Sequence, residues 1–445
     1  MSDSGFSVWQ ILPLCKPDEY DSPYMSVSSF AGNTDYIDLE ILFEQGLLTK
    51  DELEKAKQDS PYSLCRSVLG KQREKLLEKA YSRFADRQKL FEFERNEKQI
   101  SKACEFLTLR SQNKEKCWQE WTVPDLDKDL YYFNVFLQFE FYSQWEKLKE
   151  YANKKNIEIL GDLPFYVSAD SSDVWADRKN FLLDEKGKPE KVSGVPPDYF
   201  SSEGQLWGNP IYNFEEMEKD GFSWWKERIT HACKLYDCIR LDHFRAFSEY
   251  WAIPADKDKA IYGKWEKAPG EKIIDIIKQA ANGKQIIAEN LGIIDEKVDK
   301  LLDYSSFPGM AVFQFGFDGN HSNPHLPHNY SENTVAFTGT HDNNTLLGFI
   351  WEQDERTRRE ILDYVGFPSD NFDGCYETIL RMLLCSKANT VVFPIQDILG
   401  FGSDTRLNTP GKADGNWKFR ITKDNLSGID RAKWKKMNSM YSRGE

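Results

Sequence analysis

The run DCIRLDH (237–243) is short and apolar, and it stops at an acid and a histidine, Asp242 and His243. Six further runs are of the same kind, and each has the length of a strand. They are WQILPL (9–14), IEILGD (157–162), QIIAEN (285–290), MAVFQF (310–315), VAFTGTHD (335–342) and TVVFPIQD (390–397). Their apolar residues alternate little with polar ones, which is typical of parallel strands buried on both faces.

Amphipathic patterns between many of these runs predict helices, because apolar residues recur at i, i+3 and i+4. They cover residues 271–282, 295–306, 354–365 and 376–387. Alternating strands and helices, with polar residues at the carboxyl ends of the strands, are typical of a (β/α)8 TIM barrel, an α/β fold. The dinucleotide-binding alternative is disfavoured because no G-x-G-x-x-G motif follows a strand.

We expect residues 1–445 to form a single catalytic barrel domain with two insertions on its catalytic face. The stretch 20–150 is mainly helical in pattern, and the stretch 168–225 is rich in Gly, Pro and Asp. The second is expected to form loops over the active-site cleft. Seven strand-like runs are present and only MSDSGFS precedes the first, whereas a barrel closes with eight strands. We therefore expect the first βα unit to be missing at the N-terminus.

The overall charge and composition exclude several classes of function. A net charge of −14 disfavours nucleic acids and anionic membranes as partners, since these select basic patches. The mean hydropathy is −0.63, and the N-terminus lacks the charged and apolar regions of a signal peptide, so we expect a cytoplasmic protein. The eight cysteines contain no C-x2-C pair, so we expect free thiols and no metal site.

Three carboxylates follow apolar runs and are the candidates for catalysis: Asp242, Glu289 and Asp342. In a barrel they would converge on one mouth. Retaining glycosidases use one carboxylate as nucleophile and a second, about 5 Å away, as acid and base. A third can hold sugar hydroxyls. Any one of them alone would read as a helix cap or a salt-bridge partner, but three such positions indicate a site.

The motifs around these residues resemble those of amylomaltases, 4-α-glucanotransferases of the α-amylase superfamily, over essentially the whole chain. The matching segments include DSPYMSVSSFAGN (21–33), IEILGDLPFYVSADSSDVW (157–175), GVPPDYFSSEGQLWGNPIY (194–212), CIRLDHFRAFSEYWAIPA (238–255), IIAENLGII (286–294), TGTHDNNT (338–345), PIQDILGFGSDTRLNTPG (394–411) and GNWKFR (415–420). The resemblance implies transfer of α-1,4-glucan segments through a covalent glucosyl-enzyme, without a cofactor.

The resemblance also implies a role for each carboxylate. Asp242 would be the nucleophile, ionised with the help of Arg240. Glu289 would be the general acid and base, with a pKa raised by burial and by neighbouring carboxylates. Asp342 would stabilise the transition state. Asn290 stands where the family commonly has Asp, which removes a charge beside Glu289.

Further residues match sugar-contacting positions of the family. Tyr24 would stack on a donor glucose, and a loop with an overhanging tip would line the donor site. The alternative for aromatic residues of this loop is a buried anchor. The substrate-binding candidates are Tyr24, Tyr199, Phe200, Gln205, Trp207, Asn209, Arg240, His243, His341 and Asn408. Asp162 matches a strand-end Asp that is structural as much as catalytic.

The sequence leaves two hypotheses about function. The first is an active transferase that takes maltodextrins, or starch or glycogen fragments, as donors and glucose or a glucan as acceptor. The second is a catalytically impaired, N-terminally truncated glucan-binding relic. Retention of all three carboxylates favours the first. A hydrolytic α-glucosidase would share the carboxylates but lack the PPDYF loop (196–200).

Overall fold

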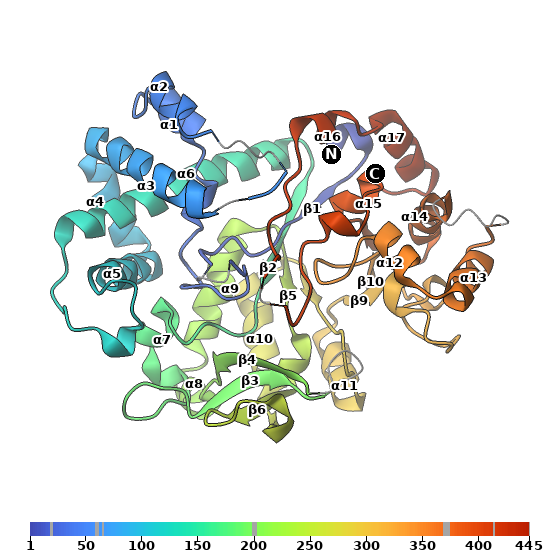
Figure 1. Ribbon diagram of the computed structural model, residues 1–445. Helices are drawn as coiled ribbons and strands as arrows, with labels where there is room; N and C mark the ends of the chain where they lie inside the picture. Colours follow the sequence, from blue (N-terminus) through green and yellow to red (C-terminus); the bar gives the residue numbers. More distant parts are fainter. Residues whose placement is uncertain are drawn as a thin grey trace.

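Seven parallel strands form the centre of the molecule (Figure 1). The computed structural model describes residues 1–17, 21–57, 62–64, 66–197, 203–367, 374–412 and 414–444. In spatial order the strands are β1 (Val8–Gln10), β2 (Glu158–Leu163), β5 (Cys238–Leu241), β8 (Ile286–Ala288), β9 (Gly309–Val312), β10 (Thr334–Phe337) and β11 (Thr390–Val392). Each overlaps one of the seven apolar runs and extends at most one residue beyond it, so the predicted barrel of parallel strands is confirmed.

Helices pack around the strands because both faces of a parallel sheet need cover. Strands β5, β8 and β9 are buried along their whole length. Helix α10 turns Ile273, Ile274 and Ile277 inward, each fully buried, and such burial stabilises by about 1.5–3 kcal/mol per side chain. The helices after the insertions are α9 (Ser223–Leu235), α10 (Gly270–Ala281), α11 (Glu296–Ser305), α12 (Leu346–Glu352), α13 (Glu355–Tyr364), α14 (Cys375–Cys385), α15 (Ile395–Leu399), α16 (Lys423–Ser427) and α17 (Arg431–Met440).

The first long connection, between β1 and β2, is helical. Its helices are α1 (Leu39–Glu44), α2 (Lys50–Glu54), α3 (Arg66–Arg83), α4 (Arg87–Asn96), α5 (Lys98–Gln112) and α6 (Lys128–Lys154). Helices α1 to α5 gather on one side of the barrel and α12 to α17 on the other (Figure 1). Asp127 caps helix α6, since its carboxylate accepts from the amides of Asp129 and Leu130, and the helix leads directly into β2.

The second long connection contains more regular structure than the expected loops. It holds α7 (Ser172–Ala176), α8 (Phe214–Lys219), β3 (Lys191–Val195) and β4 (Gln205–Pro210). Strands β3 and β4 join β6 (Glu249–Pro254) and β7 (Lys264–Lys267) in an antiparallel sheet of order β4-β3-β6-β7. The pairing of β3 with β4 shifts its register between Val192 and Gly194. Such an irregularity interrupts the alternation of side chains along a strand.

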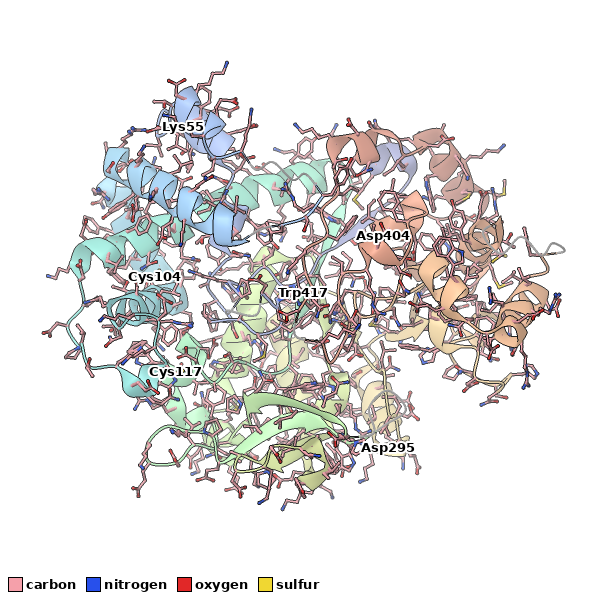
Figure 2. The ribbon with its side chains drawn as sticks, in the orientation of Figure 1. Lys55, Cys104, Cys117, Asp295, Asp404 and Trp417 are labelled. Atoms are coloured by element: carbon pink, nitrogen blue, oxygen red, sulfur yellow. The ribbon has the colours of Figure 1, made fainter. Side chains whose placement is uncertain are left out.

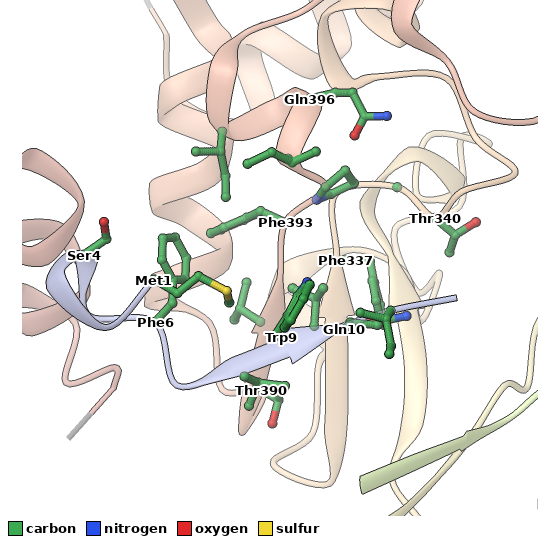
Figure 3. Close-up of a pocket in the computed structure, with 18 of the residues that line it drawn as sticks. Met1, Ser4, Phe6, Trp9, Gln10, Phe337, Thr340, Thr390, Phe393 and Gln396 are labelled. Carbon is green, nitrogen blue, oxygen red and sulfur yellow. The ribbon is translucent and has the colours of Figure 1, made fainter. Parts of the chain in front are cut away.

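Strands β1 and β11 stand at the two ends of the strand order, and in the described part of the chain no ladder joins them. Between them lies a cavity of about 860 Å³ (Figure 3). Apolar side chains, among them Trp9, Phe337 and Phe393, line it, and it reaches Arg240 and His341. The barrel is therefore open along this one side. None of the helices in the described ranges is both long and apolar enough to span a bilayer.

Candidate active site

The three candidate carboxylates lie at the carboxyl ends of three barrel strands. Asp242 and Glu289 are the first residues beyond β5 and β8, and Asp342 is five residues beyond β10. Leu241 pairs with Ala288 in the β5–β8 ladder, so Asp242 and Glu289 leave adjacent strands at the same level. Neighbouring strands are about 4.8 Å apart. The fold thus brings these two carboxylates together at one edge of the barrel.

Arg240 joins two carboxylates beneath the site. Its side chain is only 4% exposed, and Nη1 donates to Oδ2 of Asp162 at 2.5 Å while Nη2 donates to Oδ1 of Asp242 at 3.0 Å. The Asp162 side chain is fully buried. A planar guanidinium suits this arrangement because it can bond two acceptors at fixed angles. Arg240 therefore orients Asp242 and leaves its Oδ2 as the oxygen directed to other partners.

The two neighbouring carboxylates have different proton affinities. Burial raises the pKa of Asp242 to about 6, against the opposing charge of Arg240. Burial, and next the Asp242 carboxylate, raise the pKa of Glu289 well above its ordinary value. The expected upward shift of the Glu289 pKa, from burial and neighbouring carboxylates, is confirmed. Burial and the neighbouring charge therefore favour the protonated form of Glu289, as the acid of such a pair requires.

The backbone positions Glu289 as well. The amide of His243 donates to Oε2 of Glu289 at 2.8 Å, and the amide of Phe244 donates to its carbonyl oxygen at 3.0 Å. His243 adopts the left-handed conformation, with φ of 51°, which turns its amide toward the carboxylate. Beside Glu289, Oδ1 of Asn290 accepts from the amide of Met310 at 2.7 Å. Asn290 thereby ties the end of β8 to β9.

Asp342 is held ionised by neutral and charged donors. Desolvation raises its pKa, but His341 and the amide of Asn408 outweigh this and lower the pKa to about 2. Nε2 of His341 lies 3.3 Å from one oxygen, and Nδ2 of Asn408 donates to the other at 2.5 Å. Arg406 donates to the Asp342 carbonyl oxygen at 2.6 Å. The Asp342 side chain remains 46% exposed, so a ligand can reach it.

Tyr24 connects the Arg240 pair to His341. Its hydroxyl donates to Oδ2 of Asp162 at 2.6 Å and lies 3.4 Å from Nδ1 of His341. The Tyr24 and His341 rings stack with centroids 5.0 Å apart. Tyr24 is 138 positions from Asp162 and 317 positions from His341 in the sequence, so only the fold brings it to the site.

Gln205 and Trp207, two of the substrate-binding candidates on β4, lie close to His243, whose amide donates to Glu289. The Trp207 ring meets the His243 ring edge-on at 4.9 Å, and Nε1 of Trp207 donates to Oε1 of Gln205 at 3.1 Å. Burial lowers the pKa of His243 to about 4, so its imidazole is neutral at pH 7. Gln205 and Trp207 are partly exposed.

Asn209 is different, because it is buried and its amide is used within the protein. Oδ1 accepts from Ser193 at 3.1 Å, and Nδ2 donates to the Val167 carbonyl at 3.0 Å. Tyr199 and Phe200, the predicted tip of the same connection, lie outside the described residues.

Two residues for which the sequence indicates no role also contact the site residues. Arg406 secures the Asp342 backbone, and Trp417 lies beside the His341 ring, with centroids 5.8 Å apart. Both belong to motifs quoted above. The turn-forming run Asp-Gly-Asn (414–416) marks a tight loop before Trp417, but it does not indicate what the loop faces.

A barrel of parallel strands with three acids at one edge, two of them on adjacent strands and with unequal proton affinities, is the arrangement that retaining glycosidases use. The sequence model of the 4-alpha-glucanotransferase family matches residues 1–425. The chain belongs to this family.

Individual relatives agree with this assignment. The 4-alpha-glucanotransferase of Clostridium butyricum is 40% identical over 446 residues, covering 96% of this chain and 91% of that protein. The chloroplastic/amyloplastic 4-alpha-glucanotransferase of Arabidopsis thaliana is 40% identical over 95% of this chain and 76% of its own length. The amylomaltase of Streptococcus agalactiae, solved in complex with acarbose, superimposes with a TM-score of 0.95 at 37% identity, covering all of this chain and 93% of that one.

Proposed function

We propose that this chain performs its family's 4-alpha-glucanotransferase reaction with Asp242 as nucleophile, Glu289 as acid and base, and Asp342 as the group that grips the sugar in the transition state. The observation that carries this proposal is that Asp242 and Glu289 leave adjacent strands at the same level, with the pKa of Glu289 raised well above its ordinary value by burial and by Asp242.

In the first step, Glu289 donates its proton to the oxygen of an α-1,4 linkage. Oδ2 of Asp242 attacks the anomeric carbon, because Arg240 holds Oδ1. The C–O bond of the linkage breaks, the reducing-end fragment leaves as an alcohol, and a β-linked glucosyl ester forms on Asp242.

The second step reverses the proton transfer. Esterification removes the negative charge of Asp242, which is the second largest cause of the raised Glu289 pKa. The Glu289 carboxylate that remains after the first step is therefore stabilised. It accepts a proton from the 4-hydroxyl of an acceptor glucose or glucan, whose oxygen attacks the anomeric carbon and releases Asp242.

The ionised Asp342 supplies negative charge where the sugar ring develops positive charge. Its exposed oxygens are placed to accept bonds from ring hydroxyls, while His341 and Asn408 fix its orientation. Such preorganised charge is worth most in the transition state, because it needs no reorientation as the ring flattens.

The substrates that fit this proposal are α-1,4-glucans such as maltodextrins and starch or glycogen fragments. The Streptococcus agalactiae relative was solved with acarbose, which supports a sugar-binding role for the corresponding site here. The partly exposed Tyr24, Gln205 and Trp207 supply ring faces and amide groups of the kind that sugars use.

Incubation with maltotriose tests the proposal. Transfer yields glucose together with a ladder of longer maltodextrins, whereas hydrolysis yields only shorter products. Asp242→Asn is the matched control, since it keeps the shape of the side chain and removes the nucleophile.

A wild-type chain that shortens maltotriose without forming longer products is a hydrolase. One that binds maltotriose without turnover is the inactive relic. In the part of the chain that the structure describes, all three carboxylates are in place with their partners, which favours the transferase.

A further inference from the structure

Trp417 has an unusual backbone conformation beside the active site. Its φ is +62°, in the left-handed region that bulky side chains rarely adopt. It is labelled near the centre of the view in Figure 2. A strained aromatic residue persists only where its surroundings hold it, and such residues cluster at functional sites.

The loop that carries Trp417 is tied to a catalytic carboxylate. The Trp417 amide donates to the Leu407 carbonyl at 2.8 Å, and the Thr409 amide donates to Oδ1 of Asn416 at 2.9 Å. The next residue after Leu407 is Asn408, which donates to Asp342. These bonds join residues 407–409 to residues 416–417 and fix the Trp417 backbone relative to Asp342.

The indole joins an aromatic cluster on the Asp342 side of the site. Its ring lies 5.8 Å from His341 and 6.2 Å from Tyr24, tilted by 36° and 45°. Tyr24 and His341 are themselves stacked. Trp417 is only partly buried.

The chemistry assigns a direction to the site. Glu289 protonates the leaving oxygen, so the leaving fragment lies on the side of Glu289, His243 and Trp207. Trp417 instead contacts His341 and Tyr24, beside Asp342. The part of the donor that stays on the enzyme must continue away from the leaving fragment.

We propose that Trp417 stacks on the glucose unit of the donor that precedes the transferred glucosyl unit on its non-reducing side, and so favours donors that carry such a unit. This inference rests on the proposed transferase function. Trp417 is then a specificity-determining residue, and its strained backbone places the indole where this second ring passes.

Two donors separate this role from a structural one. Maltotetraose can fill the proposed position, whereas α-glucosyl fluoride supplies only the unit that becomes bound to Asp242, with fluoride as leaving group. Trp417→Gly removes the indole and accepts the positive φ without strain. We expect kcat/KM for maltotetraose to fall about tenfold or more, as for the loss of a central aromatic contact, while fluoride release with glucose as acceptor stays within about twofold.

Two further variants complete the experiment. Trp417→Phe restores a ring and should recover part of the preference for the longer donor. Phe419→Ala perturbs the same segment, where Phe419 packs on Phe401, without touching the indole. It should affect both donors equally or not at all.

Three results would overturn the proposal. Equal losses with both donors in Trp417→Gly would show that the indole only supports Asp342. Unchanged kinetics with both donors would show that no sugar contacts it. If the wild-type chain turns over neither donor, the transferase function fails first, and the proposal with it.

Discussion

Replacing Arg240 with Met should move the acid limb of the pH–rate profile to higher pH. In the wild-type chain burial raises the pKa of Asp242 to about 6 although Arg240 opposes it. Removing the cation destabilises the charged carboxylate, so the pKa rises further. The ionised fraction of the nucleophile then falls at every pH near neutrality, and the rate falls with it.

The size of the effect follows from the geometry. Nη2 of Arg240 lies 3.0 Å from Oδ1 of Asp242. At an effective dielectric constant of about 20, a pair of unit charges at that separation interacts by roughly 5 kcal/mol. One pKa unit corresponds to about 1.4 kcal/mol, so even half of that interaction is worth about 2 units. The acid limb should therefore move from near pH 6 to about pH 8 or above.

The assay is kcat/KM for maltotriose between pH 4 and 10, because this ratio reports ionisation of the free enzyme. Arg240→Met also leaves the buried Asp162 without its cationic partner, which costs about 3–5 kcal/mol of stability. Each variant is therefore checked for cooperative thermal unfolding first. Arg240→Lys keeps the charge and should hold the limb within about one unit while kcat falls, since an ammonium cannot bond both carboxylates in the same geometry.

Asp162→Asn provides a test of opposite sign. The Asp162 charge raises the pKa of Asp242, so its removal should move the acid limb below the wild-type position. If both substitutions lower kcat but leave the limb where it was, Arg240 and Asp162 do not control ionisation of the nucleophile, and the electrostatic reasoning is wrong.

Three further substitutions test other parts of the site. Glu289→Gln should lower kcat/KM for maltotriose by about 10²- to 10⁴-fold. A rapid-mixing experiment should still show a burst of fluoride from α-glucosyl fluoride, because this leaving group needs no proton. Absence of the burst would contradict the acid role of Glu289. Asn408→Ala removes a bond to ionised Asp342, worth about 1.5–3 kcal/mol, and should reduce kcat about 10- to 100-fold without changing the product pattern; an unchanged kcat would show that Asp342 needs no such support. Asn209→Ala leaves the buried Ser193 hydroxyl and Val167 carbonyl without their partner and should lower the free energy of unfolding by about 1–3 kcal/mol. The unfolding midpoint should fall with little change in KM. A raised KM at an unchanged midpoint would instead support a sugar contact.

Several features of the site were predictable from local sequence. Every barrel strand coincides with an apolar run, because a strand buried on both faces must be apolar throughout. Asp242 and Glu289 could be placed at strand ends for the same reason, since the first polar residue after such a run marks where burial stops. The rise in the Glu289 pKa also follows from two acids leaving adjacent strands.

Other features depend on contacts between distant segments. Tyr24 lies 138 positions from Asp162, to which it donates, and no periodicity connects them. Asn209 matches a sugar-contacting position, but its amide is bonded within the protein. The antiparallel sheet of β3, β4, β6 and β7 is held by pairing across the second insertion and not by the propensity of any one strand.

The sequence alone therefore determined the barrel of parallel strands and placed Asp242 and Glu289 at strand ends as candidates, because hydrophobic burial along a strand is a local pattern. The tertiary structure decided which oxygen of Asp242 is held by Arg240, how far burial shifts each pKa, and that Trp417 faces His341 and Tyr24. Those properties arise from the distances between charges and rings brought together by folding, and electrostatic energies change steeply with such distances.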